Sequence, residues 1–287
     1  MNEANLYQKI TELAKDLGFV SAGVAEVCPI EEEFTLYENA MESGCFADME
    51  YLKRNCHIRK DPGELLEGAR SILVFLAPYG SRTATPEREI EFRDGIVERY
   101  KVAQYALGRD YHKVIRKKLT VILDYIKNQV PEARGRVFAD TAPILERIWG
   151  VRAGLGFIGK NNFLISKEAG IRNFIGIIVT DVDFAKAYCN TYLKSHCGEC
   201  MRCIESCPTG ALSPYRLDAG KCISYLTIEK RGSNIELNRS MAKERDGWIF
   251  GCDACMNACP WNSRNREGWN EFKPQQETIP AAHLRRR

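Results

Sequence analysis

The chain has 287 residues, of which 45% are hydrophobic and 28% charged, which is enough to fill one large globular core or two ordinary ones. This composition excludes a disordered chain, a collagen and a coiled coil. Twelve cysteines are too few for a disulfide scaffold, and residues 1–10 lack the basic and apolar regions of a secretory signal. The longest apolar runs, 72–78 and 174–179, are far shorter than the roughly 20 residues of a membrane helix. We therefore expect a soluble, cytoplasmic protein with reduced thiols.

The net charge of +3 is unevenly placed along the chain. Residues 1–195 hold equal numbers of basic and acidic side chains, whereas residues 196–287 hold 14 basic and 11 acidic ones. This surplus is too small to indicate nucleic-acid binding by itself, because nucleic-acid-binding domains usually concentrate basic residues on one face.

The first half of the chain alternates between helix and strand patterns. Apolar residues recur at helical spacing from Leu6 to Leu17, and Gly18 follows as a stop signal. We expect residues 79–95, which are polar with Gly, Pro and Thr, to form a loop. The further predicted helices are 32–43, a short one opened by Asp61-Pro62-Gly63, 111–130 and 143–153; the predicted strands are 19–25, 71–77, 136–139, 163–166 and 174–180.

These elements interleave without a repeat period, which favours an α/β or α+β sandwich for residues 1–190. After Tyr188 the composition changes to many cysteines, few apolar runs and short helical pieces. We therefore predict an α+β protein with two domains, a sandwich over residues 1–188 and a small cysteine-rich domain over residues 189–287.

The cysteines carry the strongest signal. The first run, C-x2-C-x2-C-x3-C followed by Pro208, has the spacing of bacterial ferredoxins, in which the fourth cysteine binds the other cluster of a two-cluster protein. A second run, C-x2-C-x3-C, precedes Pro260, and one more cysteine lies between the two. Crossing the ligands assigns one [4Fe–4S] cluster to Cys197, Cys200, Cys203 and Cys259, and the other to Cys207, Cys222, Cys252 and Cys255.

Structural zinc is the alternative, because it also favours C-x2-C pairs and four thiolates. The longer crossed run favours clusters, and two clusters in one small fold imply one-electron transfer to another group. The remaining cysteines lack such spacing and are expected to be small buried hydrophobes: Cys28, Cys45, Cys56 and Cys189.

Three further motifs have competing interpretations. Residues 154–160 match both a dinucleotide fingerprint and a Walker A run only weakly, since they follow a helix and Asn161 replaces the expected Ser or Thr. An ordinary tight turn is equally compatible with them. Asp140 precedes Pro143 and is interpreted locally as a helix cap. Asp110 and His112 partly match a D-x-H-x-x-G cobalamin motif, but Ile115 replaces its glycine, so the sequence does not support axial ligation by the histidine.

Together these segments resemble the epoxyqueuosine reductase family. The resemblance extends in order over nearly the whole chain, and the segments other than the ferredoxin run make it specific. It rests on Asp48–Leu52, Tyr105–Lys113, Asp140–Arg147, Arg152–Asn161, the cysteine run from Cys197, and Gly251–Asn262.

The resemblance implies a base-off cobalamin between the two domains, reduced through two [4Fe–4S] clusters. It implies reduction of epoxyqueuosine to queuosine at the wobble position of tRNA, with Asp140 as the proton donor. An epoxide opens more readily when its oxygen is protonated, so we expect burial beside the corrin to raise the pKa of Asp140. The resemblance also assigns cobalamin-facing positions to Arg59, Asp110, Asp140, Asn161, Leu164, Cys252 and Asp253.

The resemblance also implies partners: a queuosine-type tRNA and a low-potential electron donor of the ferredoxin or flavodoxin type. We expect a monomer without membrane contact. Longer members carry a C-terminal helical-repeat extension that helps to hold tRNA, whereas this chain ends at 283–287 with a basic sequence, HLRRR. That ending could help to hold tRNA, although a charged tail is the plainer interpretation.

Two other functions compete with this one. A reductive dehalogenase-like corrinoid enzyme shares a corrin domain fused to two clusters, but such enzymes usually carry an export signal. A non-enzymatic electron-transfer module would leave the nearly 200 residues before the clusters without a purpose. Corrinoid binding distinguishes the module from both enzymes, and turnover of epoxyqueuosine-containing tRNA distinguishes the two enzymes from each other.

Overall fold

The computed structural model describes residues 2–80, 84–187 and 194–284. The predicted domain boundary at 188/189, Cys189 and the final residues 285–287 lie outside the described residues. Within the described ranges, no helix combines the length and the apolar character needed to cross a bilayer.

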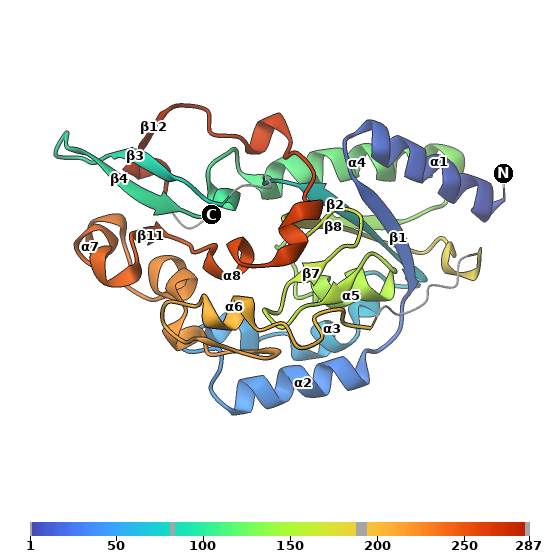
Figure 1. Ribbon diagram of the computed structural model, residues 1–287. Helices are drawn as coiled ribbons and strands as arrows, with labels where there is room; N and C mark the ends of the chain where they lie inside the picture. The colour runs from blue at the N-terminus through green and yellow to red at the C-terminus, as the bar shows by residue number, and fades with distance from the viewer. Residues whose placement is uncertain (1, 81–83, 188–193, 285–287) are drawn as a thin grey trace.

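The central element is a four-stranded antiparallel sheet in the order β1-β2-β8-β5. β2 is buried along its whole length, as expected for the continuous apolar run SILVFLA. Helices cover both faces, so the first part of the chain is a three-layer sandwich (Figure 1). The strands are β1 (Ser21–Glu26), β2 (Ser71–Pro78), β5 (Gly135–Phe138) and β8 (Asn173–Thr180).

The two faces of this sheet pack against different helices. α1 (Glu3–Asp16) and α4 (Tyr111–Gln129) share one apolar core with the sheet, and α2 (Glu31–Glu42) and α5 (Glu146–Arg152) share the other. The predicted α+β sandwich is therefore confirmed. The remaining helices are short: α3 (Cys56–Lys60), α6 (Arg202–Glu205), α7 (Ile235–Ser240) and α8 (Ala254–Asn257).

A second sheet joins residues 87–102 to the C-terminal part of the chain. β3 (Glu87–Glu91) and β4 (Val97–Val102) form a hairpin, and β11 (Trp248–Phe250) and β12 (Thr278–Pro280) pair with it in parallel on either side. The prediction of a loop over 79–95 is wrong for β3. In β3 only Ile90 is buried, and the strand is completed by a partner almost 190 residues away, which a local pattern cannot reveal.

Two pairs of two-residue strands complete the strand list, and the first of them lies in the glycine-rich segment. β6 (Phe157–Ile158) pairs with β7 (Leu164–Ile165), and β9 (Leu212–Ser213) pairs with β10 (Arg216–Leu217). An isolated bridge joins Ser166 to Gly170. The helix predicted from Pro143 begins only at Glu146, and the one opened by Asp61 is a single 3₁₀ turn, Pro62–Leu65.

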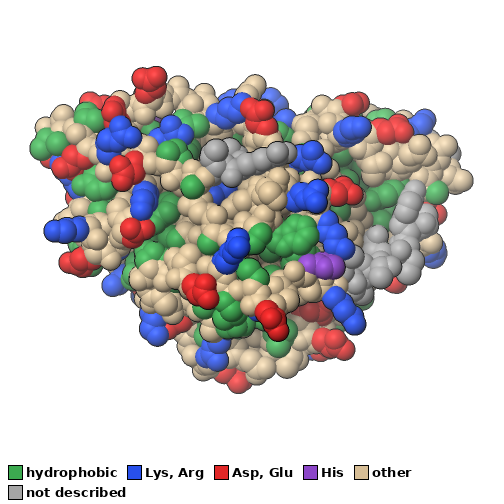
Figure 2. Space-filling view, viewed as in Figure 1, with side chains coloured by type: hydrophobic (Ala, Val, Ile, Leu, Met, Phe, Trp, Pro, Cys, Tyr) green, Lys and Arg blue, Asp and Glu red, His purple; other side chains and the backbone are tan. Residues whose placement is uncertain are grey.

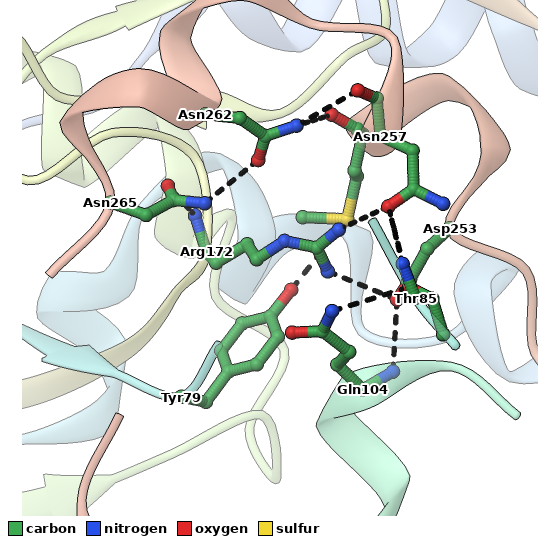
Figure 3. Close-up of polar contacts among 9 residues, drawn as sticks. Tyr79, Thr85, Gln104, Arg172, Asp253, Asn257, Asn262 and Asn265 are labelled. Atoms are coloured by element: carbon green, nitrogen blue, oxygen red, sulfur yellow. Dashed lines mark hydrogen bonds and ion pairs between the residues drawn. The ribbon is translucent and has the colours of Figure 1, made fainter. Parts of the chain in front are cut away.

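A buried polar network attaches the cysteine-rich segment to the central sheet. Arg172, just before β8, and Asp253, just before α8, form an ion pair of 3.0 Å with side chains 0% and 3% exposed. The same Asp253 oxygen accepts hydrogen bonds from the Thr85 hydroxyl at 2.6 Å and from the Gln104 N–H at 2.9 Å (Figure 3). A buried charge with this many partners is well compensated.

Asparagine side chains within and just after the second cysteine run extend the network. Asn257 accepts from Arg172 Nη2 at 2.5 Å. Asn265 accepts from the N–H groups of Ile171 and Arg172 at 2.9 and 3.2 Å. Its own amide donates to Asn262 at 2.7 Å (Figure 3). The residues from 253 to 265 are thus fixed against the start of β8.

The ion pair makes a prediction about stability. We expect Arg172→Met to lower the free energy of unfolding by about 3–5 kcal/mol, because it leaves the Asp253 carboxylate buried without its cation. Arg70→Met is the matched control: its 3.8 Å pair with Asp183 is 61% exposed on the arginine side, and its loss should cost under about 1 kcal/mol. Denaturant unfolding of cluster-loaded protein without oxygen measures both. Equal losses would contradict the assigned role.

Candidate cofactor and active site

The cysteines of the two runs form two groups in space. Burial, followed by the charges of Cys197, Cys203 and Cys200 nearby, raises the pKa of Cys259 to about 11. Burial also raises the pKa of Cys252 to about 12, with further increases from Cys222 and Cys207. These neighbours match the two predicted ligand sets, with the last cysteine of each run lying in the other run's group.

Cys255 lies between the groups, because Cys252 and Cys222 from one group and Cys203 from the other add to the effect of burial that raises its pKa. Burial thus opposes ionisation of Cys252, Cys255 and Cys259, so a bound cationic centre is needed to hold these three as thiolates. The eleven cysteines that the structure describes are all free. Among the described residues, no three His, Cys, Asp or Glu side chains are grouped to hold a single metal ion. The choice between zinc and clusters therefore rests on the family comparison below.

The glycine-rich segment contacts the first cysteine run. Lys160 Nζ donates to the carbonyl oxygens of Gly198 at 2.7 Å and Cys200 at 3.2 Å, and its backbone N–H donates to Cys197 Sγ at 3.5 Å. A side chain at Gly156 would collide with the carbonyl of Ile165 on β7. The segment is thus a tight turn that brings a lysine to a cysteine loop, which is a use that its sequence did not reveal.

Asp140 does not cap a helix, and that local interpretation is wrong. It follows β5 with a left-handed backbone, φ 53°, and α5 starts six residues later without a side-chain cap. Its carboxyl accepts a hydrogen bond from the Tyr111 hydroxyl at 2.5 Å, and His112 Nε2 lies 3.9 Å from the same oxygen. Its backbone N–H donates to Glu146 Oε1 at 2.7 Å. The loop therefore presents the carboxyl instead of using it for the fold.

Tyr111 beside Asp140 is buried and Glu146 is half-buried, whereas Asp140 itself is exposed. Its side chain is 67% exposed, so the expected burial is absent in the protein alone. Burial and then the Asp140 charge raise the pKa of Tyr111 above its usual range, so the phenol stays a neutral donor; its ring stacks on Phe174 at 4.1 Å. Burial and then Asp140 also raise the pKa of Glu146 to about 8. Glu146 was missed because nothing in its local sequence distinguishes it from a surface carboxylate.

Two of the predicted cobalamin-facing residues have buried donors without partners. Arg59 on α3 is 8% exposed and donates from Nη2 to the Tyr51 carbonyl at 3.3 Å, but its Nε has no hydrogen-bond partner. Asn161, after the glycine-rich turn, is 4% exposed, and its Nδ2 likewise has none. Buried donors of this kind are rare in proteins and need an acceptor. The amide-rich edge of a corrin would supply acceptors, so these two residues fit the cofactor.

The other predicted cobalamin-facing side chains have partners within the protein. Asp110 caps α4, accepting from the His112 N–H at 3.1 Å and lying 2.9 Å from His112 Nδ1. Leu164 is buried in the core beside Gly150, and Asp253 belongs to the network described above. Cys252 belongs to the second cysteine group. For Asp110, Leu164 and Asp253 the structure shows roles in the fold.

Family models match both parts of the chain. Residues 59–141 match the model described as "Epoxyqueuosine reductase QueG, DUF1730". Residues 196–262 match the 4Fe-4S double cluster binding domain. This part of the chain is therefore a double [4Fe–4S] cluster domain and not a zinc site, and the assignment of the eight cysteines to the two clusters stays a prediction.

Curated and solved relatives agree with these models. The epoxyqueuosine reductase of Leadbetterella byssophila is 35% identical over 270 residues, which cover 94% of this chain and 84% of that protein. This chain belongs to the epoxyqueuosine reductase family. A crystal structure of an epoxyqueuosine reductase with a tRNA-Tyr epoxyqueuosine-modified stem loop superposes with a TM-score of 0.80 at 27% identity, covering 96% of this chain and 70% of that one. The family resemblance that the sequence motifs indicated is thus confirmed.

Two further structures bear on the site and on the alternatives. The epoxyqueuosine reductase of Bacillus subtilis, with a TM-score of 0.79 at 26% identity over 96% of this chain and 70% of that one, was solved with the catalytic loop of an aspartate swung out of the active site. A catabolic reductive dehalogenase superposes with a TM-score of 0.53 at 15% identity, covering 95% of this chain and 33% of that one. The dehalogenase shares the fold alone, so that alternative receives no support as a function.

The two cysteine groups predict how iron is lost. We expect Cys259→Ala and Cys197→Ala to remove the same cluster, and Cys222→Ala to remove the other, because one missing thiolate opens a four-thiolate site. Each variant should hold about four irons instead of about eight. Cys45→Ala, at a buried cysteine outside both groups, is the control and should keep all of them. Iron analysis, together with electron paramagnetic resonance of the reduced proteins, tests this. If Cys259→Ala and Cys222→Ala lost the same cluster signal, the crossed ligand sets would be refuted.

Proposed function

We propose that this chain reduces epoxyqueuosine to queuosine in tRNA, using a base-off cobalamin and two [4Fe–4S] clusters. The observation that carries the proposal is Asp140: an exposed carboxyl on a left-handed turn, held by a buried neutral phenol beside a half-buried carboxyl. A loop shaped in this way serves a ligand and not the fold, since its strained backbone brings no packing. The family membership supplies the reaction.

The residues present fit the cofactors. The eight cysteines hold the clusters, and Arg59 and Asn161 offer their unpartnered donors to the polar edge of the corrin. Cobalamin, when bound, supplies a strongly reducing cobalt centre that accepts electrons through the clusters. The lysine at position 160 keeps the first cysteine loop at the edge of the sandwich, where the two parts of the chain meet. Asp110, Leu164, Cys252 and Asp253 complete the proposed surroundings by shaping the protein next to the cofactor.

Asp140 supplies the proton that the epoxide oxygen needs as its C–O bond breaks. Reduction of the epoxide to the alkene consumes two electrons and two protons and releases the oxygen as water. The open position of Asp140 lets an RNA base approach, and its burial then comes from the corrin and the base. Tyr111 orients the carboxyl through its hydrogen bond, while Glu146 fixes the backbone of the loop. The swung-out catalytic loop of the B. subtilis relative supports a loop that can move.

The proposed partners are a queuosine-type tRNA and a one-electron donor of the ferredoxin or flavodoxin type, with the enzyme acting as a cytoplasmic monomer. The two-domain division at 188/189 is also part of the proposal. The second sheet connects the two parts, since it combines strands from both sides of this boundary. The face in Figure 2 carries Lys and Arg side chains interspersed with Asp and Glu. Binding of RNA on such a face requires local basic sites instead of one continuous basic surface.

Substitution of the proton donor tests this function. We expect Asp140→Asn to lower single-turnover conversion of epoxyqueuosine in a tRNA stem loop by about 100- to 10,000-fold, the usual contribution of a general acid. Iron content and corrinoid binding should not change. Asp124→Asn, at an exposed carboxylate on α4, is the control and should turn over normally. Mass spectrometry of the digested nucleosides gives the readout. Full conversion by Asp140→Asn would rule out the role, and no conversion by the unmodified chain would rule out the function.

A further inference from the structure

A basic pocket of about 390 Å³ lies between α4 and β5, beside the Asp140 loop. Its lining includes two arginines, one from the helix and one from the strand, together with an aromatic ring and a hydroxyl. The lining residues are Arg116, Arg136, Val137, Phe138 and Thr141. None of them has a role in the cofactor sites described above.

The two guanidinium groups are available to an anion. Among the described residues, no carboxylate lies within ion-pair distance of Arg116 or Arg136, although ion pairs are common elsewhere on this surface. Arg136 donates from Nη1 to the Leu65 carbonyl at 2.7 Å, and its guanidinium carbon lies 5.1 Å from the centre of the Phe138 ring. These contacts orient the arginine without neutralising it.

The pocket is adjacent to the proposed chemistry. Thr141 follows Asp140 directly and lines the pocket. Arg116 lies one helical turn after His112, whose Nε2 is 3.9 Å from the Asp140 carboxyl. Lys117 is exposed on the same turn of α4 and adds positive charge, whereas Lys113 lies 4.0 Å from the Asp110 carboxylate. An anionic group bound here would therefore lie next to a base that reaches Asp140.

We propose that this pocket binds a backbone phosphate of the RNA next to the modified nucleotide, which positions that nucleotide at Asp140. This inference rests on the proposed function. A polynucleotide cannot bring one base to Asp140 without bringing its neighbouring phosphates close to the same loop. Guanidinium groups match phosphate oxygens in pairs, and contacts of this kind set the register of a nucleic acid on a protein without selecting its sequence.

The direct test is RNA affinity as a function of salt, measured with an anticodon stem loop that lacks the epoxide, so that no turnover is involved. We expect Arg116→Gln to weaken binding about tenfold, the effect of losing one hydrogen bond to a charged group. The slope of log K against log salt should fall in magnitude by about 0.7, the value for one phosphate contact on a single strand. Arg116→Lys should keep most of the slope.

Lys127→Gln is the matched control, because it removes one positive charge from the same helix about 16 Å further along. If Arg116→Gln and Lys127→Gln had the same RNA affinity and the same salt slope, the proposal would be overturned. Arg136→Gln is the second variant: the proposal requires the same loss of slope from a different element, and an unchanged slope would also overturn it. The unfolding midpoint of each variant identifies a change that comes from misfolding.

Failure of this inference and failure of the proposed function are distinguishable. If the unmodified chain converts epoxyqueuosine but Arg116→Gln binds RNA like Lys127→Gln, the function stands and the phosphate pocket is wrong. If Arg116→Gln loses affinity and slope but the unmodified chain converts nothing, the pocket binds RNA and the reaction is wrong.

Discussion

The structure depends on one buried ion pair, Arg172 with Asp253. It joins the residue before β8 in the central sheet to the residue before α8 in the second cysteine run. Asp253 occupies the N-cap position of α8 but makes no side-chain cap there, because its carboxylate is used by Arg172, Thr85 and Gln104. The Asp253 carboxylate thus makes long-range contacts instead of capping its own helix. These contacts and the second sheet set the position of the cysteine-rich segment relative to the sandwich.

A second constraint is the way in which the active loop is supported. Tyr111 is buried, neutral and stacked on Phe174, and it holds the carboxyl of Asp140 from below. Glu146 holds the backbone of the same residue. The protein thus fixes where the carboxyl is while leaving it accessible. In the proposed function, cofactor and substrate would complete the low-dielectric surroundings that a proton donor needs. An acid that is already enclosed could not admit a nucleotide within an RNA strand.

Local patterns predicted those features whose causes are local. The apolar periodicity of α1 and α4 and the continuous apolar run of β2 each carry their own physical reason, and these predictions are confirmed. The cysteine spacings correctly predicted two [4Fe–4S] clusters, while the crossed ligand sets stay a prediction. β3 was missed because its partners β4 and β12 decide it, and only Ile90 shows a buried side chain. The cap interpretation of Asp140 failed because Pro143 does not start the helix: its first residue is Glu146.

Contacts between distant segments could not be predicted from local sequence patterns either, because the partner residues lie far away along the chain. Nothing near Lys160 indicates that its side chain reaches the carbonyls of Gly198 and Cys200, and nothing near Arg172 indicates a partner 81 residues away. For the cofactor, Arg59 and Asn161 show the unpartnered buried donors that a polar ligand requires. For Asp110 and Leu164 the structure shows cap and core roles, which the family resemblance could not distinguish from cofactor contacts.

The central claim is that this fold unites two clusters and a corrinoid for one reaction. Its most direct measurement is a visible spectrum, with iron and cobalt analysis, of protein purified without oxygen and mixed with cobalamin. The account predicts about eight irons and one bound base-off corrinoid per chain. Iron without corrinoid binding would contradict the mechanism and leave a protein that only carries electrons.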